Sequence, residues 1–286
     1  MEQTLITTVL LPLALGIIML GLGLSLTIDD FKRTLVYPKA ILIGLLIQVV
    51  LLPVLCYFIA IGFGLTSAIA VGLMLLAASP GGATANLYSH LANGDVALNI
   101  TLTAINSVIS LITLPIIVNF ALQHFMLTES YIAPQFKKII EVATIILIPV
   151  IIGMLIKSKK PNWEQAMNKP LRIFSIIVLV VLIAITLLKE KDKVADYFAT
   201  VGLAALAFNL ISMTIGYLIP QLFKINRKQS IAIGMEIGIH NGTLAIFIAQ
   251  TVLSNTDMAI APAIYSLIMF FTAGAFGWWI SQKRFQ

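Results

Sequence analysis

Charged residues are scarce in this sequence. They make up 10% of its 286 residues, whereas soluble domains carry about 25%. Hydrophobic residues account for 59% of the chain, and the mean hydropathy is +1.02. This balance excludes an ordinary soluble domain and predicts an all-α polytopic membrane protein. The net charge of +6 does not indicate nucleic-acid binding, because the basic residues lie in short loops between apolar runs.

Cysteine is also scarce, and the signatures of several enzyme classes are missing. Cys56 is the single cysteine, so no intrachain disulfide can form. The sequence contains no P-loop, HExxH, CxxC or GxSxG pattern. We therefore expect a chain that is not an enzyme, that does not hydrolyse ATP, and that needs neither an organic cofactor nor an obligate protein partner. The apolar run from Leu5 to Ile28 has no basic segment before it, which favours a retained helix over a cleaved signal.

Long apolar runs are abundant. A bilayer requires about 20 apolar residues per helical span. Nine stretches approach this length, and polar or helix-breaking residues interrupt the third and the eighth. The predicted spans are about 5–27, 39–63, 67–91, 97–124, 136–157, 170–188, 196–222, 229–253 and 258–281.

Lysine and arginine predict the orientation, because they concentrate on the cytoplasmic side of membrane proteins. With the N-terminus outside, thirteen basic residues face inward and five face outward. The inward set is Lys32, Arg33, Lys39, Lys157, Lys159, Lys160, Lys169, Arg172, Lys224, Arg227, Lys228, Lys283 and Arg284. The outward set is Lys137, Lys138, Lys189, Lys191 and Lys193. We expect a multi-pass protein of the bacterial inner membrane with its C-terminus in the cytoplasm.

A weak internal repeat relates the two halves. Ile69-Ala-Val-Gly72 returns as Ile231-Ala-Ile-Gly234 at an offset of 162 residues, and the span boundaries agree at the same offset. Residues 1–124 would form the first repeat half, and residues 125–286 would contain an unpaired fifth span and the second half. One odd span between the halves inverts the second copy, as in many secondary transporters. Together the halves make one transporter domain.

The third span contains Ser79-Pro-Gly-Gly-Ala-Thr-Ala-Asn86. Pro80 has no backbone N–H, and the two glycines that follow have the greatest backbone freedom. We expect a helix break near the middle of the membrane. Such irregular backbone is tolerated there only where it is buried in protein or lines a wet cavity.

The eighth span contains a carboxylate, Glu236, among apolar residues and glycines. A charge at this depth costs about 2.5–3.5 kcal/mol on insertion scales, so it needs compensation. One explanation is a structural pair with His240, one turn away. The other is a bound cation, since carboxylate, amide and carbonyl oxygens suit a hard cation. In span four, Asn99, Thr103 and Asn106 share one helix face and are expected to point inward. Gln48 in span two and Asn209 in span seven could form ordinary interhelical hydrogen bonds.

These motifs resemble those of the bile acid:sodium symporter family. The resemblance rests on Pro80-Gly-Gly-x-x-x-Asn86 paired with Glu236-Ile-Gly-Ile-His-Asn241, and it extends over essentially the whole chain, including Gly21-Leu-Gly-Leu and Asp95-Val-Ala-Leu98. It implies two crossed, broken helices in a core of spans two, three, four, seven, eight and nine. Spans one, five and six would form a panel, and rocking between core and panel would give alternating access.

The resemblance also implies site residues. The first sodium site would use Asn86, Asn99, Thr103 and Glu236, with Ala85 beside them. The second would use Gln48, Glu236, the backbone near Ile237 and Ile239, and His240. Ala83, Thr84 and Asn241 would face the substrate cavity.

Four positions depart from the family pattern. Ala85 replaces the usual serine, which removes a hydroxyl but not the carbonyl. His240 replaces the usual glutamine, and an imidazole nitrogen is a poor sodium ligand, so the second site is in question. Met269 and Phe270 stand where some bacterial relatives have polar residues, which indicates a more apolar cavity wall.

The leading hypothesis is a sodium-coupled symporter of an organic anion, either a bile-acid-like amphipathic acid or a small carboxylate metabolite. An alternative within the same architecture is proton coupling through Glu236 and His240, because histidine titrates in the physiological range. A ligand-gated channel or membrane sensor is a third hypothesis, which the inverted repeat disfavours.

Overall fold

The computed structural model describes residues 11–65, 67–126, 136–189 and 194–282. Apart from one isolated bridge, the regular structure in these ranges is helical, which confirms the predicted all-α class. Residues 5–10 of the first predicted span lie outside the described ranges. So do four of the counted basic residues, Lys191, Lys193, Lys283 and Arg284.

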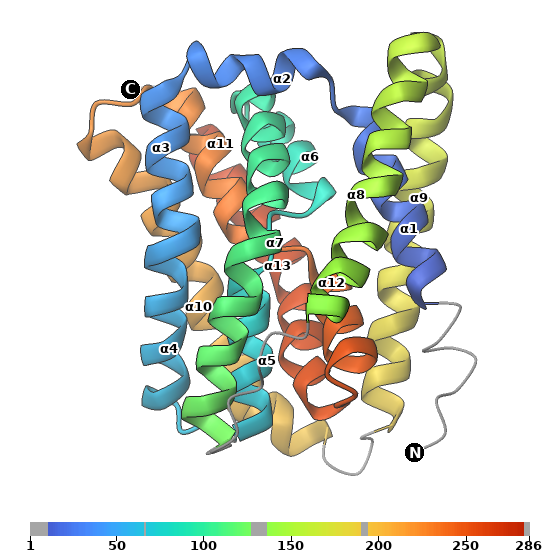
Figure 1. Cartoon of the computed structure of the whole chain (residues 1–286). Helices are drawn as coiled ribbons and strands as arrows, with labels where there is room; N and C mark the ends of the chain where they lie inside the picture. The colour runs from blue at the N-terminus through green and yellow to red at the C-terminus, as the bar shows by residue number, and fades with distance from the viewer. Residues whose placement is uncertain (1–10, 66, 127–135, 190–193, 283–286) are drawn as a thin grey trace.

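The helices follow one another with short connections (Figure 1). Their bounds are α1 Leu11–Ser25, α2 Ile28–Lys32, α3 Pro38–Leu46, α4 Leu52–Gly62, α5 Ser67–Ala78, α6 Ala83–Leu91, α7 Val96–Met126, α8 Phe136–Lys159, α9 Pro161–Lys189, α10 Val194–Leu222, α11 Arg227–Gly238, α12 Gly242–Phe247 and α13 Ile260–Gln282. Two π-helical turns, Ile47–Leu51 between α3 and α4 and Ile248–Val252 after α12, keep those segments continuous.

Local sequence explains several of these boundaries. Thr27 and Asp30 form a capping box that starts α2. The side chain of Asn226 accepts a hydrogen bond from the Gln229 N–H and so caps α11. The π turn at Ile47–Leu51 lies just before Pro53, whose missing N–H disturbs the regular hydrogen-bond ladder.

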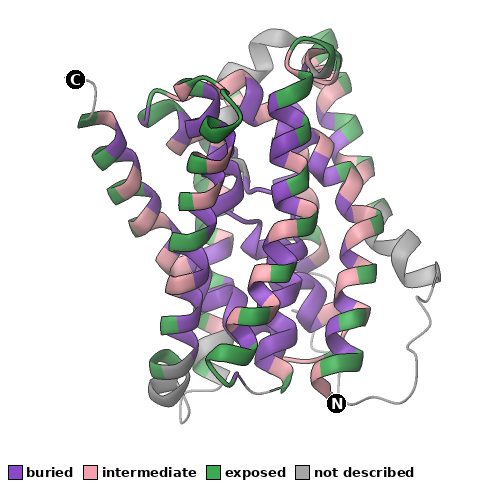
Figure 2. Ribbon diagram, turned by 90° about the vertical axis from the view of Figure 1, so that its left-hand side faces the viewer, coloured by how far each residue is buried: buried purple, intermediate pink, exposed green. Residues whose placement is uncertain are grey.

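Within the described ranges, four helical segments are long and apolar enough to cross a membrane: Pro38–Gly62, Val96–Met126, Val201–Leu222 and Asp257–Gln282. Large apolar side chains such as Ile112, Phe271 and Trp278 are exposed on the outer surface. Figure 2 shows buried residues gathered along the inward helix faces and exposed residues on the outward ones. This pattern fits a lipid environment rather than water. The count of nine spans and the inverted repeat stay predictions.

The helices form two groups. α1 packs along α8 and α9 on one side of the molecule (Figure 1). Gly23 of α1 and Gly153 of α8 bring the two backbones together, because a Cβ at either position would overlap backbone atoms of the other helix. The remaining helices pack against one another, with α10 covering α11 and α7 covering α5. As expected for close helix packing, Gly234 and Gly238 lie against α10, and Gly242 lies against Ser266 of α13.

Candidate functional site

Both predicted interruptions are present, and they meet. Helix α5 ends at Ala78 and α6 starts at Ala83, whereas α11 ends at Gly238 and α12 starts at Gly242. The Gly82 N–H donates to the Ile239 carbonyl at 2.8 Å, and the Asn241 N–H donates to the Pro80 carbonyl at 2.9 Å. These two bonds join the interruptions as a short antiparallel bridge. Backbone groups left over by the breaks are thereby satisfied inside the protein.

Glu236 lies in the last turn of α11 and is 2% exposed. The Thr103 hydroxyl of α7 donates to its Oε2 at 2.6 Å. Among the described side chains, no lysine, arginine or histidine forms an ion pair with it, so the structural pair with His240, one of the two explanations considered for this carboxylate, is not formed. A buried carboxylate without a positive partner is costly, and it calls for a proton or a cation.

Gly81 presses against this carboxylate from the other break. A Cβ on Gly81 would overlap the carboxylate atoms of Glu236. The approach therefore requires glycine at this position, which gives the Pro80-Gly81-Gly82 motif a second role besides breaking the helix.

The polar face predicted on the fourth span is confirmed, since Asn99, Thr103 and Asn106 of α7 are all buried. The Asn99 amide donates to the Ala232 carbonyl at 2.7 Å, one turn of α11 before Glu236. The Thr103 hydroxyl also lies 3.0 Å from the Asn99 carbonyl. Helix α7 is thus attached to the carboxylate segment at two levels.

Several buried oxygen atoms near the breaks accept no hydrogen bond from any described residue. They are Glu236 Oε1, Asn99 Oδ1, Asn86 Oδ1 and Gln48 Oε1, together with Asn209 Oδ1 and Ser266 Oγ. Buried acceptors without donors are uncommon and costly, and coordination of a cation satisfies such oxygens. The first four belong to residues predicted as sodium ligands. Ala85 is buried next to Asn86 in α6 and contributes no polar side-chain atom.

Two of the residues predicted for the second sodium site, Gln48 and His240, meet at the end of α5. The Gln48 amide donates to the carbonyls of Ala77 and Ser79, at 3.3 and 3.1 Å. His240 Nδ1 lies 3.4 Å from the same Ser79 carbonyl, and its Nε2 has no partner in the described part of the chain. Ile237 and Ile239 are buried on either side of Gly238, and the Ile239 carbonyl is already bonded to Gly82. A nitrogen atom and an occupied carbonyl make this set a poorer match to sodium than the set around Asn99.

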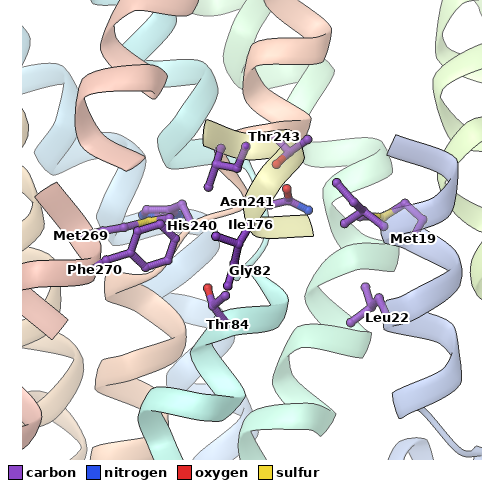
Figure 3. A pocket seen from close by; sticks show the side chains of 13 residues that line it. Met19, Leu22, Gly82, Thr84, Ile176, His240, Asn241, Thr243, Met269 and Phe270 are labelled. Carbon is purple, nitrogen blue, oxygen red and sulfur yellow. The ribbon is translucent and has the colours of Figure 1, made fainter. Parts of the chain in front are cut away.

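A cleft of about 50 Å³ adjoins the meeting point of the breaks (Figure 3). Its polar side includes Thr84, His240, Asn241 and Thr243. Of the predicted substrate residues, Thr84 and Asn241 line it. Ala83 lies between two lining residues, Gly82 and Thr84, and its own side chain is outside the described set.

The remaining lining residues of the cleft are apolar. As the departures from the family pattern indicated, they include Met269 and Phe270 of α13. Sequence reasoning did not find the other apolar lining residues, which come from α1 and α9: Ile18, Met19, Leu22, Ile176 and Leu179. No local motif marks them, since they resemble every other residue of an apolar span.

Asn241 presents only its donor to the cleft. Its Oδ1 accepts a hydrogen bond from the Leu244 N–H at 3.0 Å and caps α12. The amide nitrogen is left to face a ligand, and Figure 3 shows it directed toward the side of the cleft where Met19 lies. The polar side of the cleft therefore favours a ligand group that accepts hydrogen bonds.

The fold and this site define a class: helical membrane proteins in which two interrupted helices meet around a buried carboxylate and a small cleft. Comparison with known proteins agrees. The model of the sodium bile acid symporter family matches residues 12–197. The chain belongs to this family, which is a family of transporters.

Three relatives illustrate the range of the family. The uncharacterized sodium-dependent transporter YocS of Bacillus subtilis (strain 168) is 26% identical over 253 residues, which cover 88% of this chain and 77% of the relative. The rat (Rattus norvegicus) hepatic sodium/bile acid cotransporter is 26% identical over 92% of this chain and 71% of its own. A probable chloroplastic sodium/metabolite cotransporter, BASS2 of Oryza sativa subsp. japonica, is 25% identical over 93% of this chain but only 62% of its own.

Proposed function

We propose that the chain is a secondary transporter that couples the movement of a small organic anion to sodium. The observation that carries this proposal is the set of unpartnered oxygens around Glu236, on and beside two interrupted helices. Membership of a family of sodium-dependent transporters supports it.

The charge of the site favours a monovalent cation. Glu236 is the one carboxylate among the residues predicted to bind the ion, and the other contributors are neutral amide or hydroxyl groups. One positive charge neutralises this set, whereas a divalent ion would leave a net charge buried in the protein. Asn86, Asn99, Thr103 and Glu236 would hold the ion, with the Ala85 carbonyl beside them.

The cleft favours an anion with an apolar body. None of its described lining residues is lysine or arginine, so the head group would be bound by neutral donors. Asn241 offers its amide nitrogen. The N-cap residue of α6 is Gly82, which has no side chain, so no side chain competes with an anion for the first N–H groups of α6. Seven apolar residues complete the lining. One water molecule needs roughly 10–15 Å³ of cavity volume, so a cleft of about 50 Å³ holds only a few. The cleft must therefore widen to admit a bile-acid-like molecule, whereas a small carboxylate metabolite requires less change.

Alternating access would occur between the two groups of helices. The cleft lies between α1 and α9 on one side and α6, α12 and α13 on the other. We propose that α1, α8 and α9 form the panel of the family fold, that the other helices form its core, and that core and panel rock against each other around the site. The inverted halves 1–124 and 125–286 would each contribute helices to both. The excess of lysine and arginine on the side predicted to face the cytoplasm supports the orientation with the N-terminus outside.

Uptake into proteoliposomes tests the function. Purified protein should accumulate a radiolabelled small carboxylate above equilibrium when sodium is higher outside, and equal potassium should not replace sodium. Accumulation driven by a pH gradient without sodium would contradict sodium coupling and support proton coupling through Glu236 and His240. Flux that only equilibrates the anion would indicate a channel.

A further inference from the structure

The last carbonyl groups of an α-helix have no partner within the helix. Inside a membrane protein these carbonyls need hydrogen-bond donors from other helices, because no water is available to donate to them. The first interrupted helix, α5, receives such a donor from Gln48, which bonds to the carbonyls of Ala77 and Ser79. The second, α11, receives one from Asn209 of α10, whose amide donates to the Gly238 carbonyl at 2.9 Å.

The two arrangements share a chain separation and a type of hydrogen bond. Gln48 precedes Ala77 by 29 residues, and Asn209 precedes Gly238 by the same number. In both cases the NH₂ group is committed to a carbonyl acceptor, and the amide oxygen has no partner in the described part of the chain. This repeated hydrogen bond is independent of the identities from which the internal repeat was predicted.

The second arrangement has an additional donor. The Tyr265 hydroxyl of α13 also donates to the Gly238 carbonyl, at 2.9 Å. Tyr265 is fully buried, and its ring packs against Phe208 and His240 with centroids 5.7 and 5.5 Å apart. Two helices therefore hold one carbonyl oxygen. That carbonyl lies two residues after Glu236 and two before His240.

We propose that Asn209 and Tyr265 are positioning residues for the cation site. They fix the Gly238 carbonyl, and through it the end of α11, so that the Glu236 carboxylate stays directed at Thr103 and Gly81. The role rests on the proposed function, because it assumes that Glu236 binds sodium. Neither residue reaches the ion in this proposal; each acts through the backbone that carries Glu236.

The loss of these donors should weaken sodium binding in steps. Removing one donor leaves the Gly238 carbonyl bonded to the other, whereas removing both leaves a buried acceptor unsatisfied. The end of α11 can then rotate toward a regular helical turn, which withdraws Glu236 from its partners. We expect the apparent sodium affinity to fall about tenfold in Asn209→Leu, about threefold in Tyr265→Phe, and by more than the product in the double variant, since the two share one acceptor.

Thermal unfolding of the purified full-length chain in detergent tests the role. Each variant is titrated with NaCl at constant ionic strength, with KCl as the balancing salt. The readouts are the unfolding temperature in KCl, which reports the fold, and the sodium concentration that gives half of the stabilisation, which reports the site. Ser212→Ala is the matched control, because the Ser212 hydroxyl is buried on the same helix and bonds only within it, to the Phe208 carbonyl.

The expected result is a raised half-stabilising sodium concentration in Asn209→Leu and Tyr265→Phe, with Ser212→Ala equal to wild type. Tyr265→Phe removes one oxygen atom and keeps the ring packing, so it gives a reading even if Asn209→Leu folds poorly. A lower unfolding temperature in KCl with an unchanged half-stabilising concentration would overturn the positioning role. A wild-type chain that sodium does not stabilise more than potassium would overturn the proposed function, and this role with it.

Discussion

The two interrupted helices differ in what causes each break and in what each contributes. The break between α5 and α6 follows from Pro80 and two glycines, so local sequence explains it, and it contains no charged residue. The break between α11 and α12 contains no proline, but His240 lies in it and Glu236 lies in the helical turn just before it. It is held open by contacts from elsewhere, through Pro80, Asn209 and Tyr265.

Their second halves differ as well. The side chain of Asn241 caps α12, whereas α6 follows Gly82 and has no side-chain cap. The break before α6 thus supplies backbone without side chains, which can lie close to the Glu236 carboxylate. No side chain caps the first N–H groups of α6. The other break supplies the titratable side chains. The site needs both breaks, because Gly81 can lie against the Glu236 carboxylate only if position 81 carries no side chain.

The largest expected effect is the loss of the charge itself. Glu236→Gln keeps the shape of the side chain but removes the negative charge that a cation would neutralise. Sodium-driven accumulation in proteoliposomes should fall by more than about 100-fold, which corresponds to roughly 2.7 kcal/mol or more. Circular dichroism should show an intact helical fold, since a neutral amide costs less to bury than a carboxylate.

Thr103→Ser is the control for this variant, because it keeps the hydroxyl that donates to Glu236 and should retain most of the uptake. Sodium-driven uptake that survives in Glu236→Gln would show that the cation binds elsewhere.

The next effect tests the contribution of the first break. In Gly81→Ala the new methyl group would displace the Glu236 carboxylate, so the half-saturating sodium concentration for uptake should rise about 10- to 50-fold. Gly202→Ala is the matched control within a helix, because its Cβ meets only the Phe198 ring at an ordinary 3.6 Å. Equal sodium dependence in the two variants would mean that the close approach of Gly81 has no role in cation binding.

A smaller effect separates substrate binding from cation binding. Asn241→Asp keeps an oxygen that can cap α12, but it replaces the donor that faces the cleft with a negative charge. The KM for the anion should rise about tenfold through like-charge repulsion, while sodium still stabilises the purified protein. Asn241→Ser, which keeps both a cap and a donor, should lie close to wild type. An unchanged KM in Asn241→Asp would exclude Asn241 from the anion site.

Much of this site was predictable because its signals are local. A proline followed by two glycines breaks a helix, and polar residues spaced three and four apart on α7 turn inward, where Asn99 and Thr103 are found. Glu236 is conspicuous because a carboxylate is rare in an apolar span. The resemblance to the family rested on the same local motifs and is confirmed by the match over residues 12–197.

Other features depend on tertiary packing and left no local signal. Nothing near Gly81 in the chain reveals that its missing side chain makes room for Glu236. The wall formed by Met19 and Leu179 looks like any apolar helix surface. The partner of Asn209 was also hidden, because a single amide in an apolar span gives no sign of which carbonyl it will meet. The inverted repeat, the membrane orientation and the assignment of ligands remain predictions.

Calorimetric titration of the purified chain with NaCl tests the central claim most directly, namely that the unpartnered oxygens around Glu236 bind sodium. The wild-type protein should give a saturable heat of binding with sodium and none with potassium, and Glu236→Gln should give none with either ion. A saturable sodium heat of the same size and affinity in Glu236→Gln, or no sodium heat in the folded wild-type protein, would contradict the claim.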